Sequence, residues 1–384
     1  MTITVVGGGL AGLVAAIECA ERGAGSVELH EATSLLGGRA RSTTGEFVAN
    51  HGGHVVYADG PLWAWLRERG LGQPARKPPL RGLRFRWDGR SRVRPPVALV
   101  SALRLLRHDA PVDRSLREWA TELLGHDGAE LLCRSCHVFS FDADPGRLSA
   151  AFCMERLRRA VSLPPVTRYI VGGWGAMVQQ LAERARSLGV TITTGSRIEQ
   201  MQVDRGPVIV ATELSAAARL LDDPSLSWTG TRTAILDVGF RSRRGDPFVV
   251  VDLDDGVFVE RYTAPDPTLA PRGHQLIQTQ VGLWPDESLD DGVHRIESCL
   301  DACFTDWRAR EVWRRRYVVT DATGALDLPG TTWRDRPAID RGDGVFLCGD
   351  MVAAPGLLGE VSLASAIDAA RLACGREATT ARAR

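Results

Sequence analysis

The chain has 384 residues, which is enough for about two domains and a sizeable core. Its hydrophobic content of 44% and charged content of 24% are typical of a soluble protein, and its net charge of zero argues against wholesale nucleic-acid binding. No stretch approaches about eighteen uninterrupted apolar residues, and the first residues enter a strand pattern rather than a signal peptide. We therefore expect a cytoplasmic protein whose eight cysteines are reduced.

The first thirty-one residues have the pattern of a βαβ unit. Thr2–Val6 is predicted to be a short apolar strand, residues 7–12 a tight glycine turn, and Leu10–Arg22 a helix with one apolar face. A second strand over Val27–Leu29 continues to Glu31. The turn has the G-x-G-x-x-G spacing, which between a strand and a helix predicts a dinucleotide site.

The three glycines of this turn have separate expected roles. Gly7 permits the turn, Gly9 lets a pyrophosphate approach the backbone, and Gly12 lets the helix pack on the strand. The diphosphate would rest on the positive end of the helix, and Glu31, nineteen residues after Gly12, is placed to accept hydrogen bonds from a ribose diol. The alternative is a glycine-rich turn that packs and binds nothing.

Two further glycine-rich segments follow Glu31. The first is Leu36–Arg41, in which Arg39 can meet a phosphate or a flavin edge, and the second is Phe47–His54. At this point the sequence resembles the flavoprotein superfamily that includes phytoene desaturases, protoporphyrinogen oxidases and monoamine oxidases. The resemblance implies that the second segment lies beneath the isoalloxazine ring. It departs from the family at Asn50, where desaturase-like members often carry Asp.

The composition changes after Pro78-Pro79. Leu83–Trp87 and Arg90–Arg94 flank Asp88-Gly89, which is a strong hairpin pattern. Helices are expected over residues 97–108, 116–136 and 149–160. Ten arginines stand against four acidic residues in 81–118, which favours a solvated basic face; an anionic substrate or a membrane surface is the alternative.

A cysteine pair lies in the second of these helices. Cys133, Cys136 and His137 formally match the C-x-x-C-H pattern of covalent haem attachment. That chemistry needs an exported chain, and no export signal is present in the sequence. A redox-active dithiol is a second interpretation. We expect instead two cysteines on one helical face, turned into a core.

The glycine-rich organisation returns after Arg168. Gly172-Gly173-Trp174-Gly175 precedes a helix over 176–188, and short strands are expected over 190–193, 198–203 and 208–212. This block resembles the segment that completes the FAD domain of the family, where an apolar residue at the place of Ile198 holds the adenine through its backbone. No second G-x-G-x-x-G turn precedes a helix, so we expect no dedicated NADPH site.

Residues 226–335 have the pattern of an antiparallel sheet. Strands are expected over residues 233–240, 248–252, 257–262 and 275–281, and a helix over 293–304. The turn at 270–274 resembles the one that joins two such strands in desaturase-like members.

The closing residues carry a second strong motif. Val345–Cys348 is predicted to be a buried strand, followed by Gly349-Asp350, a glycine-rich loop and an alanine-rich helix over 363–373. In the family this is the C-terminal FAD segment, in which the residue at Asp350 lies near the ribityl chain and the pyrophosphate. Residues 359–361 would face the pyrimidine edge of the flavin, where a helix N-terminus stabilises negative charge.

The resemblance implies an α/β fold: a Rossmann-like FAD-binding domain built from discontinuous segments, plus an α+β substrate domain with an antiparallel sheet and helices. The FAD domain is expected to comprise 1–80, 166–225 and 336–384, and the substrate domain 81–165 and 226–335. FAD is expected rather than NAD, because a nicotinamide dehydrogenase would explain the first motif but not the last. The residues expected to contact FAD are Gly7, Gly9, Leu10, Ala11, Gly12, Glu31, Ala32, Gly38, Arg39, Gly52, Gly53, His54, Ile198, Ala211, Gly349, Asp350, Gly359, Glu360 and Val361.

The expected reaction is removal of a hydride equivalent from a hydrophobic small molecule, as in phytoene-dehydrogenase-like desaturation in natural-product or isoprenoid metabolism. Oxygen, a quinone or another acceptor would then take the electrons. A flavin amine oxidase that forms an imine, a redox-neutral isomerase or cyclase, and a non-catalytic flavin-binding scaffold are the alternatives.

No residue qualifies by spacing as a catalytic acid or base. His54, Tyr57 and Arg41 are nearest to the expected flavin face and are the catalytic candidates. Amine oxidases of the superfamily place a lysine near the flavin, but Lys77, the one lysine of the chain, lies in a proline-rich linker. No metal site and no nucleic-acid partner are expected, and peripheral membrane contact is compatible with the basic face without being required.

Overall fold

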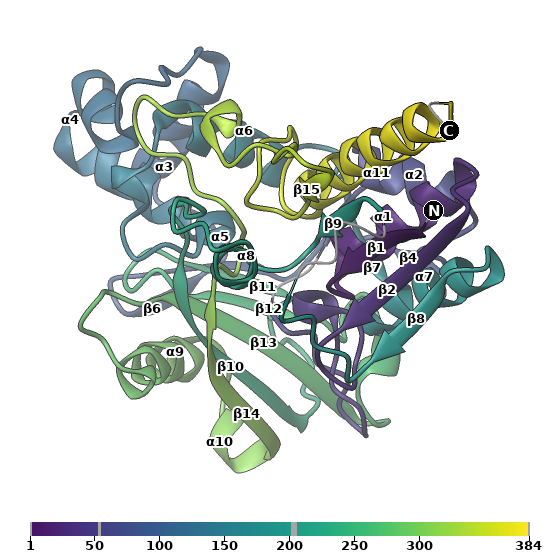
Figure 1. Cartoon of the computed structure of the whole chain (residues 1–384). Coiled ribbons are helices and arrows are strands. Elements are labelled where there is room, and N and C mark those ends of the chain that lie inside the picture. Colours follow the sequence, from purple (N-terminus) through teal and green to yellow (C-terminus); the bar gives the residue numbers. More distant parts are fainter. Residues whose placement is uncertain (1, 53–54, 201–205, 383–384) are drawn as a thin grey trace.

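The computed structural model describes residues 2–52, 55–200 and 206–382, and it divides into a parallel sheet, an antiparallel sheet and a helical insertion (Figure 1). The parallel sheet has the strand order β15-β9-β1-β2-β8. All four pairings in it are parallel. Its strands are β1 (Thr2–Val6), β2 (Ser26–Glu31), β8 (Thr191–Thr194), β9 (Val208–Val210) and β15 (Val345–Leu347).

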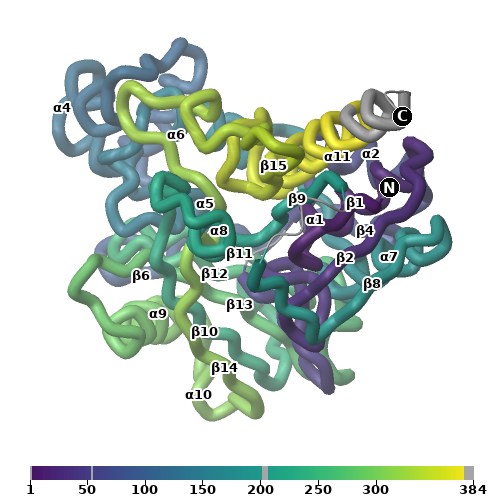
Figure 2. The backbone as a smooth tube through the Cα atoms, in the orientation of Figure 1, coloured from purple at the N-terminus to yellow at the C-terminus, as the bar shows by residue number. Residues whose placement is uncertain are grey.

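The strands of this sheet come from the beginning, the middle and the end of the chain. Figure 2 shows the tube entering this region in purple, returning in teal and ending there in yellow. Strand β9 lies between β1 and β15 and is parallel to both. The segments that follow β1 and β15, which carry the N-terminal and C-terminal motifs, therefore lie at the same end of the sheet. The carboxyl ends of parallel strands are where such sheets bind ligands.

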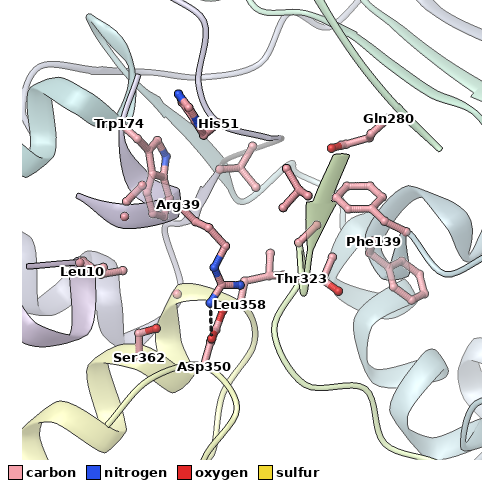
Figure 3. Close-up of a pocket in the computed structure, with 18 of the residues that line it drawn as sticks. Leu10, Arg39, His51, Phe139, Trp174, Gln280, Thr323, Asp350, Leu358 and Ser362 are labelled. Carbon is pink, nitrogen blue, oxygen red and sulfur yellow. Dashed lines mark hydrogen bonds and ion pairs between the residues drawn. The ribbon is translucent and has the colours of Figure 1, made fainter. Parts of the chain in front are cut away.

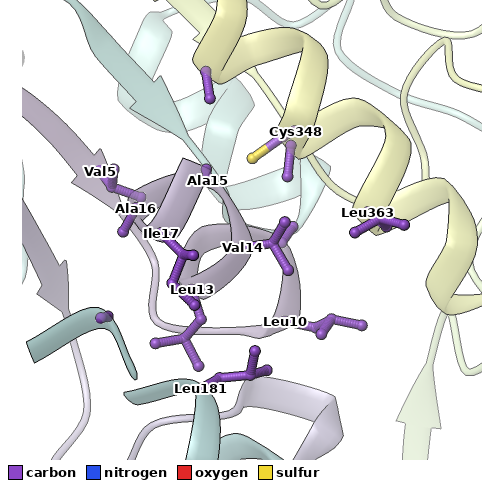
Figure 4. Close-up of a cluster of buried hydrophobic side chains, with 14 of the residues drawn as sticks. Val5, Leu10, Leu13, Val14, Ala15, Ala16, Ile17, Leu181, Cys348 and Leu363 are labelled. Carbon is purple, nitrogen blue, oxygen red and sulfur yellow. The ribbon is translucent and has the colours of Figure 1, made fainter. Parts of the chain in front are cut away.

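Helix α1 (Leu10–Glu21) is the centre of the first core. Buried residues, among them Leu13, Val14 and Ile17, occur on all faces of the helix, as expected for a helix that is apolar on all sides. It packs against α7 (Gly173–Ser187) on one side and α11 (Gly359–Arg382) on the other (Figure 4). Helix α2 (Pro61–Glu68) also contacts α11, next to a small sheet of β3 (Val56–Tyr57), β7 (Thr167–Ile170) and β4 (Ala75–Arg76).

The second large sheet has the order β14-β10-β13-β12-β11-β5-β6. All of its pairings are antiparallel except β11 with β5. One face packs on α9 (Leu289–Cys303) through residues such as Leu236, Val259 and Ile277. The strands are β5 (Leu83–Trp87), β6 (Arg90–Arg92), β10 (Arg232–Arg241), β11 (Val249–Asp252), β12 (Phe258–Arg261), β13 (His274–Gly282) and β14 (Glu311–Thr320).

The helical insertion forms its own small core at one end of this sheet. Its helices are α3 (Val97–Ala102), α4 (Leu116–Ser135), α5 (His137–Ser140) and α6 (Ala150–Ala160). Cys133 and Cys136 are 2% and 0% exposed and belong to this core, so the prediction that they pack is confirmed. Two further helices are α8 (Leu214–Leu221) and α10 (Trp307–Arg310).

The predicted fold class is confirmed, with local differences in several elements. Strand β14 was not anticipated, because its arginine-rich half hides the alternation of half-buried and exposed residues. The helix expected over 97–108 changes to a 3₁₀ turn after Ala102, and α11 begins at Gly359 rather than at Leu363. Residues 198–200 are not a strand, and the rest of that expected strand lies outside the described residues. None of the described helices is both long and apolar enough to span a bilayer.

Candidate functional site

A cavity of about 1230 Å³ lies between the parallel sheet, the antiparallel sheet and the helical insertion (Figure 3). It is larger than a pocket for one drug-sized ligand, which is typically about 300–1,000 Å³. One end is lined by backbone of the glycine-rich segments and the other by aromatic and aliphatic side chains. The cavity therefore has room for two ligands end to end.

The first glycine turn has the shape that a diphosphate needs. Gly7 has φ +109°, a left-handed conformation, and a Cβ on Gly12 would lie 1.9 Å from the Gly7 carbonyl oxygen. A Cβ on Gly9 would meet its nearest atom only at 3.9 Å. Gly7 and Gly12 are thus required by the turn and the packing, whereas Gly9 faces open space at the N-terminus of α1.

Glu31 lies at the carboxyl end of β2, beside the turn. Its carboxylate accepts hydrogen bonds of 2.8 Å from the backbone N–H groups of Gly8 and Thr33. These bonds fix the carboxylate on the cavity wall, next to Ala32 and near Ile198. A carboxylate has about four lone-pair sites, so it retains capacity for ribose hydroxyls.

Arg39 and Asp350 connect the first and last motifs. The Arg39 guanidinium donates to the Asp350 carboxylate at 2.7 Å and also to the Asp321 carbonyl oxygen (Figure 3). Burial alone would lower the pKa of Arg39, but the Asp350 carboxylate outweighs burial and raises this pKa. Arg39 is therefore a permanent positive charge in the middle of the cavity, where the diphosphate of a dinucleotide bound on α1 would lie.

Asn50 makes hydrogen bonds through its side-chain oxygen and through both of its backbone groups. Its Oδ1 atom accepts from the Ser42 hydroxyl and from the Trp174 N–H, both at 2.9 Å. Its backbone N–H donates to Gln278 at 3.1 Å, and its carbonyl accepts from Gln278 and Arg315. The segment expected beneath the isoalloxazine is thus fixed to α7 and to the antiparallel sheet.

The N-terminus of α11 reaches the cavity only in part. Gly359 and Ser362 line it. Glu360 does not line it: its carboxylate is 4% exposed and pairs with Arg159 of α6 at 2.8 Å. Val361 is also absent from the lining, at 2% exposed.

Two of the three catalytic candidates line the cavity. The buried Nε of Arg41 has no hydrogen-bond acceptor among the described residues. Burial raises the pKa of Tyr57, and the Arg159 guanidinium carbon lies 4.3 Å from the centre of its ring. His54 and Gly53 lie outside the described residues.

Most of the residues predicted to contact FAD meet at one end of the cavity, although they come from three parts of the chain. Gly12 and Gly52 do not line it. Those that do are Gly7, Gly9, Leu10, Ala11, Glu31, Ala32, Gly38, Arg39, Ile198, Ala211, Gly349, Asp350 and Gly359.

Sequence reasoning missed the other end of the cavity, which we call the chamber. The chamber is lined by side chains of one face of the antiparallel sheet and of the helical insertion, including Phe139, Phe141, Phe248, Phe258, Glu260, Tyr262 and Gln280. Phe258 and Glu260 of β12 and Tyr262 just after it alternate along the chain, and all three line the cavity. This alternation was readable in the sequence, but nothing in the sequence shows what the face covers.

Glu260 is the buried acid of the chamber, at 4% exposed. Burial raises its pKa to about 7, although hydrogen bonds from the hydroxyls of Tyr169 and Tyr262 act to lower it. No ion pair of the described residues includes Glu260. Within the same residues, no cluster of histidine, cysteine and acidic side chains is arranged to hold a metal ion.

Comparisons with known proteins agree with this architecture. Residues 5–69 match the family model of an NAD(P)-binding Rossmann-like domain, which agrees with the Rossmann-like fold predicted for this part of the chain. A search among curated proteins gives no significant match.

Solved structures share the fold over almost the whole chain. An oxidoreductase from Methanosarcina mazei has a TM-score of 0.76 at 16% identity, covering 96% of this chain and 99% of that one. Cyclohexylamine oxidase from Brevibacterium oxydans has a TM-score of 0.73 at 15% identity, covering 98% and 99%. Reduced UDP-galactopyranose mutase has a TM-score of 0.74 at 17% identity, covering 98% and 96%. The chain therefore has the two-domain fold found in these oxidoreductases and in this mutase.

Proposed function

We propose that this chain is an FAD-dependent oxidoreductase that takes a hydride equivalent from a lipophilic small molecule. The observation that carries the proposal is the continuity of one cavity from the glycine turn at Gly9 to the apolar chamber. A cofactor held at the first end extends toward a substrate held at the other. The fold shared with named oxidoreductases supports the same reaction class.

The residues at the glycine end fit FAD. Glu31 would hold the ribose, the N-terminus of α1 and Arg39 the diphosphate, and the Asn50 segment the flavin ring, with Gly359 near the ring's polar edge. When bound there, FAD supplies a two-electron acceptor. The chain's own contribution is to position both ligands and exclude water.

The chamber lining favours an apolar substrate. Leu99, Phe139 and Phe258 are among the side chains that line it, and burying such surface gains about 25 cal/mol per Å². Desaturation, as in phytoene-dehydrogenase-like proteins, and oxidation of an amine to an imine are both compatible with this lining. Oxygen, a quinone or another soluble acceptor would reoxidise the cofactor in the cytoplasm.

A redox-neutral isomerisation or cyclisation is the second candidate. It is supported by the fold shared with UDP-galactopyranose mutase. The aromatic chamber argues against a nucleotide sugar as its substrate, because a pocket for such a polar ligand needs many convergent hydrogen-bonding groups.

An absorption spectrum of the purified protein tests the cofactor. Flavin bands near about 370 and 450 nm that bleach with dithionite, with FAD in the released material, are the expected result. Anaerobic bleaching by a lipophilic substrate would then identify an oxidoreductase, whereas product of unchanged mass would identify the redox-neutral candidate. A colourless protein that cannot be reconstituted with FAD would overturn the proposal.

A further inference from the structure

Glu260 is a buried acidic group of the chamber to which the proposed function has assigned no role. Glu260 lies on β12, near the middle of the antiparallel sheet, and its side chain faces the cavity rather than α9. Phe258 and Tyr262 flank it on the same face. Among the described residues that line the chamber, Glu260 is the one buried carboxyl, and most of the others are apolar.

Four other buried acids of the described residues have a cationic partner, which Glu260 lacks. Asp252 pairs with Arg86 at 3.0 Å, Asp327 with Arg336 at 2.9 Å, and Glu360 with Arg159 at 2.8 Å. Asp237 likewise pairs with Arg315. Within residues 2–52, 55–200 and 206–382, Glu260 has no such partner. A buried carboxylate without a cation is costly, so a ligand that supplies the cation would be favoured.

The surroundings of Glu260 orient it without neutralising it. The Tyr169 hydroxyl, from β7, donates to Oε1 of Glu260, and Tyr262 donates a second hydrogen bond. Two neutral donors fix the carboxyl and leave it lone pairs for a third. Aromatic rings of Tyr169, Phe248 and Tyr262 pack together around it, with centroids 5.9–6.1 Å apart, and such rings also attract a cation.

Glu260 is also close to the segment expected beneath the flavin. Its cross-strand neighbour on β13 is Gln278, and paired side chains have Cβ atoms about 4.5–5.5 Å apart. Gln278 in turn bonds both the N–H and the carbonyl of Asn50. A group bound at Glu260 would therefore lie at the cofactor side of the chamber.

We infer that Glu260, held by Tyr169 and Tyr262, is a cation-binding subsite of the chamber and that the substrate is a lipophilic molecule with a basic nitrogen. The nitrogen would bind as an ammonium to the carboxylate, with its apolar part against the aromatic wall. This inference rests on the proposed function for the chamber being the substrate site.

Calorimetry with two matched probes tests the subsite. We would titrate the purified protein with 4-phenylbutylamine and with 4-phenylbutanol, which share shape and apolar surface but differ in charge. The wild-type chain is expected to bind the amine at least about tenfold more tightly, as for one charged hydrogen-bonded pair. Glu260→Gln keeps the shape of the side chain and an oxygen that can accept from Tyr169 but removes the negative charge, so it should abolish the preference.

Asp252→Asn is the control for the loss of a buried carboxylate. Asp252 lies on the adjacent strand β11 but pairs with Arg86 on the α9 side, outside the cavity. It should leave the preference for the amine unchanged. A preference that survives in Glu260→Gln, or a wild-type chain that binds both probes equally or neither, would overturn the inference.

The flavin spectrum separates this inference from the proposed function. Calorimetry measures amine binding whether or not FAD is bound. A protein that prefers the amine but takes up no FAD would therefore support the subsite and contradict the proposed oxidoreductase function. FAD uptake without amine preference would do the opposite.

Discussion

The two ends of the cavity are built in different ways. At the cofactor end much of the lining comes from short glycine-rich segments such as residues 9–11 and 37–39, each contiguous in the chain, together with the side chains of Glu31 and Arg39. At the chamber end the contacts are side chains of single residues, and Phe139, Glu260 and Gln280 belong to an inserted helix and two different strands. The first end depends on local turn geometry and the second on long-range packing.

The two ends are therefore sensitive to different kinds of substitution. A turn that binds through its backbone fails when a side chain is added to it, because the chain cannot move away without losing the turn. A chamber built from side chains tolerates changes of volume better but depends on how its buried acidic group is neutralised and hydrogen-bonded. Single substitutions test that contrast.

Gly12→Ala should abolish FAD binding. The added Cβ would lie 1.9 Å from the Gly7 carbonyl oxygen, so α1 would be displaced from β1 and the turn would open. The amount of flavin recovered per chain after purification should fall to less than about a tenth of the wild-type amount, which corresponds to a loss of about 1.4 kcal/mol or more of binding free energy. Gly375→Ala in α11 is the control, because a Cβ there meets nothing within 4 Å. Full flavin content in Gly12→Ala would refute the packing role of Gly12.

Arg159→Met should cost about 4 kcal/mol of unfolding free energy, because it leaves the carboxylate of Glu360 buried without its cation. The pair joins α6 of the insertion to α11 of the parallel-sheet region. Urea denaturation measures the loss, and Arg371→Met, an exposed pair with Asp368, is the control. If both variants lose the same small amount, the pair is not what joins the two regions.

Glu260→Gln should change how stability depends on pH. Burial raises the folded-state pKa of Glu260 to about 7 from 4.5, so the folded chain holds a proton that the unfolded chain releases between these values. The stability that Glu260 contributes is complete below about pH 4.5 and is lost as pH rises to about 7, a loss of about 3 kcal/mol.

Denaturation of both chains from pH 5 to 8 measures this difference. Wild type should lose stability relative to Glu260→Gln as pH rises, so that the variant is the more stable chain at pH 8. Asp237 and Asp252 are present in both chains, and their raised pKa values cancel in the comparison. Parallel curves would show that Glu260 titrates as an exposed acid does.

Arg39→Ala should weaken FAD binding by about tenfold to a hundredfold, the value of one or two charge-assisted hydrogen bonds. It removes the cation that faces the diphosphate and leaves the Asp350 carboxylate in its place. The dissociation constant from flavin fluorescence should also depend less on salt. Arg243→Ala, which removes an exposed arginine paired with Asp306, is the control, and an equal effect of both would remove Arg39 from the cofactor site.

Cys133 and Cys136 should show the smallest effect. Burial raises the pKa of Cys133 to about 12 and that of Cys136 well above its usual value, so neither thiolate is available at neutral pH. Iodoacetamide should label both only after the chain is unfolded, as mass spectrometry of the peptides would show. Rapid labelling of either thiol in the folded protein would restore the redox-dithiol hypothesis.

Local sequence patterns were enough to predict the βαβ unit at the start of the parallel sheet. Spacing and apolar pattern were enough for β1, α1 and β2, and the glycines named for the turn have the conformations and contacts that their roles require. The hairpin of β5 and β6 and the strands β10 to β13 were also predictable, since each follows from alternation and turn residues within about ten positions. Local interactions explain these successes.

The lining of the chamber depends on long-range contacts that no local sequence pattern predicts. The pairing of β5 with β11 joins residues 83–86 to residues 249–252, and no local pattern encodes that parallel register. Strand β14 escaped detection because Arg314, Arg315 and Arg316 have partners in other segments, including Glu297, Asp237 and Asp290. The environment of Glu260 was set in the same way: its burial, its tyrosine donors and the absence of a cationic partner among the described residues all depend on residues far away in the chain. A side chain's electrostatic environment is set by its neighbours in space, and these are fixed only when the chain has folded.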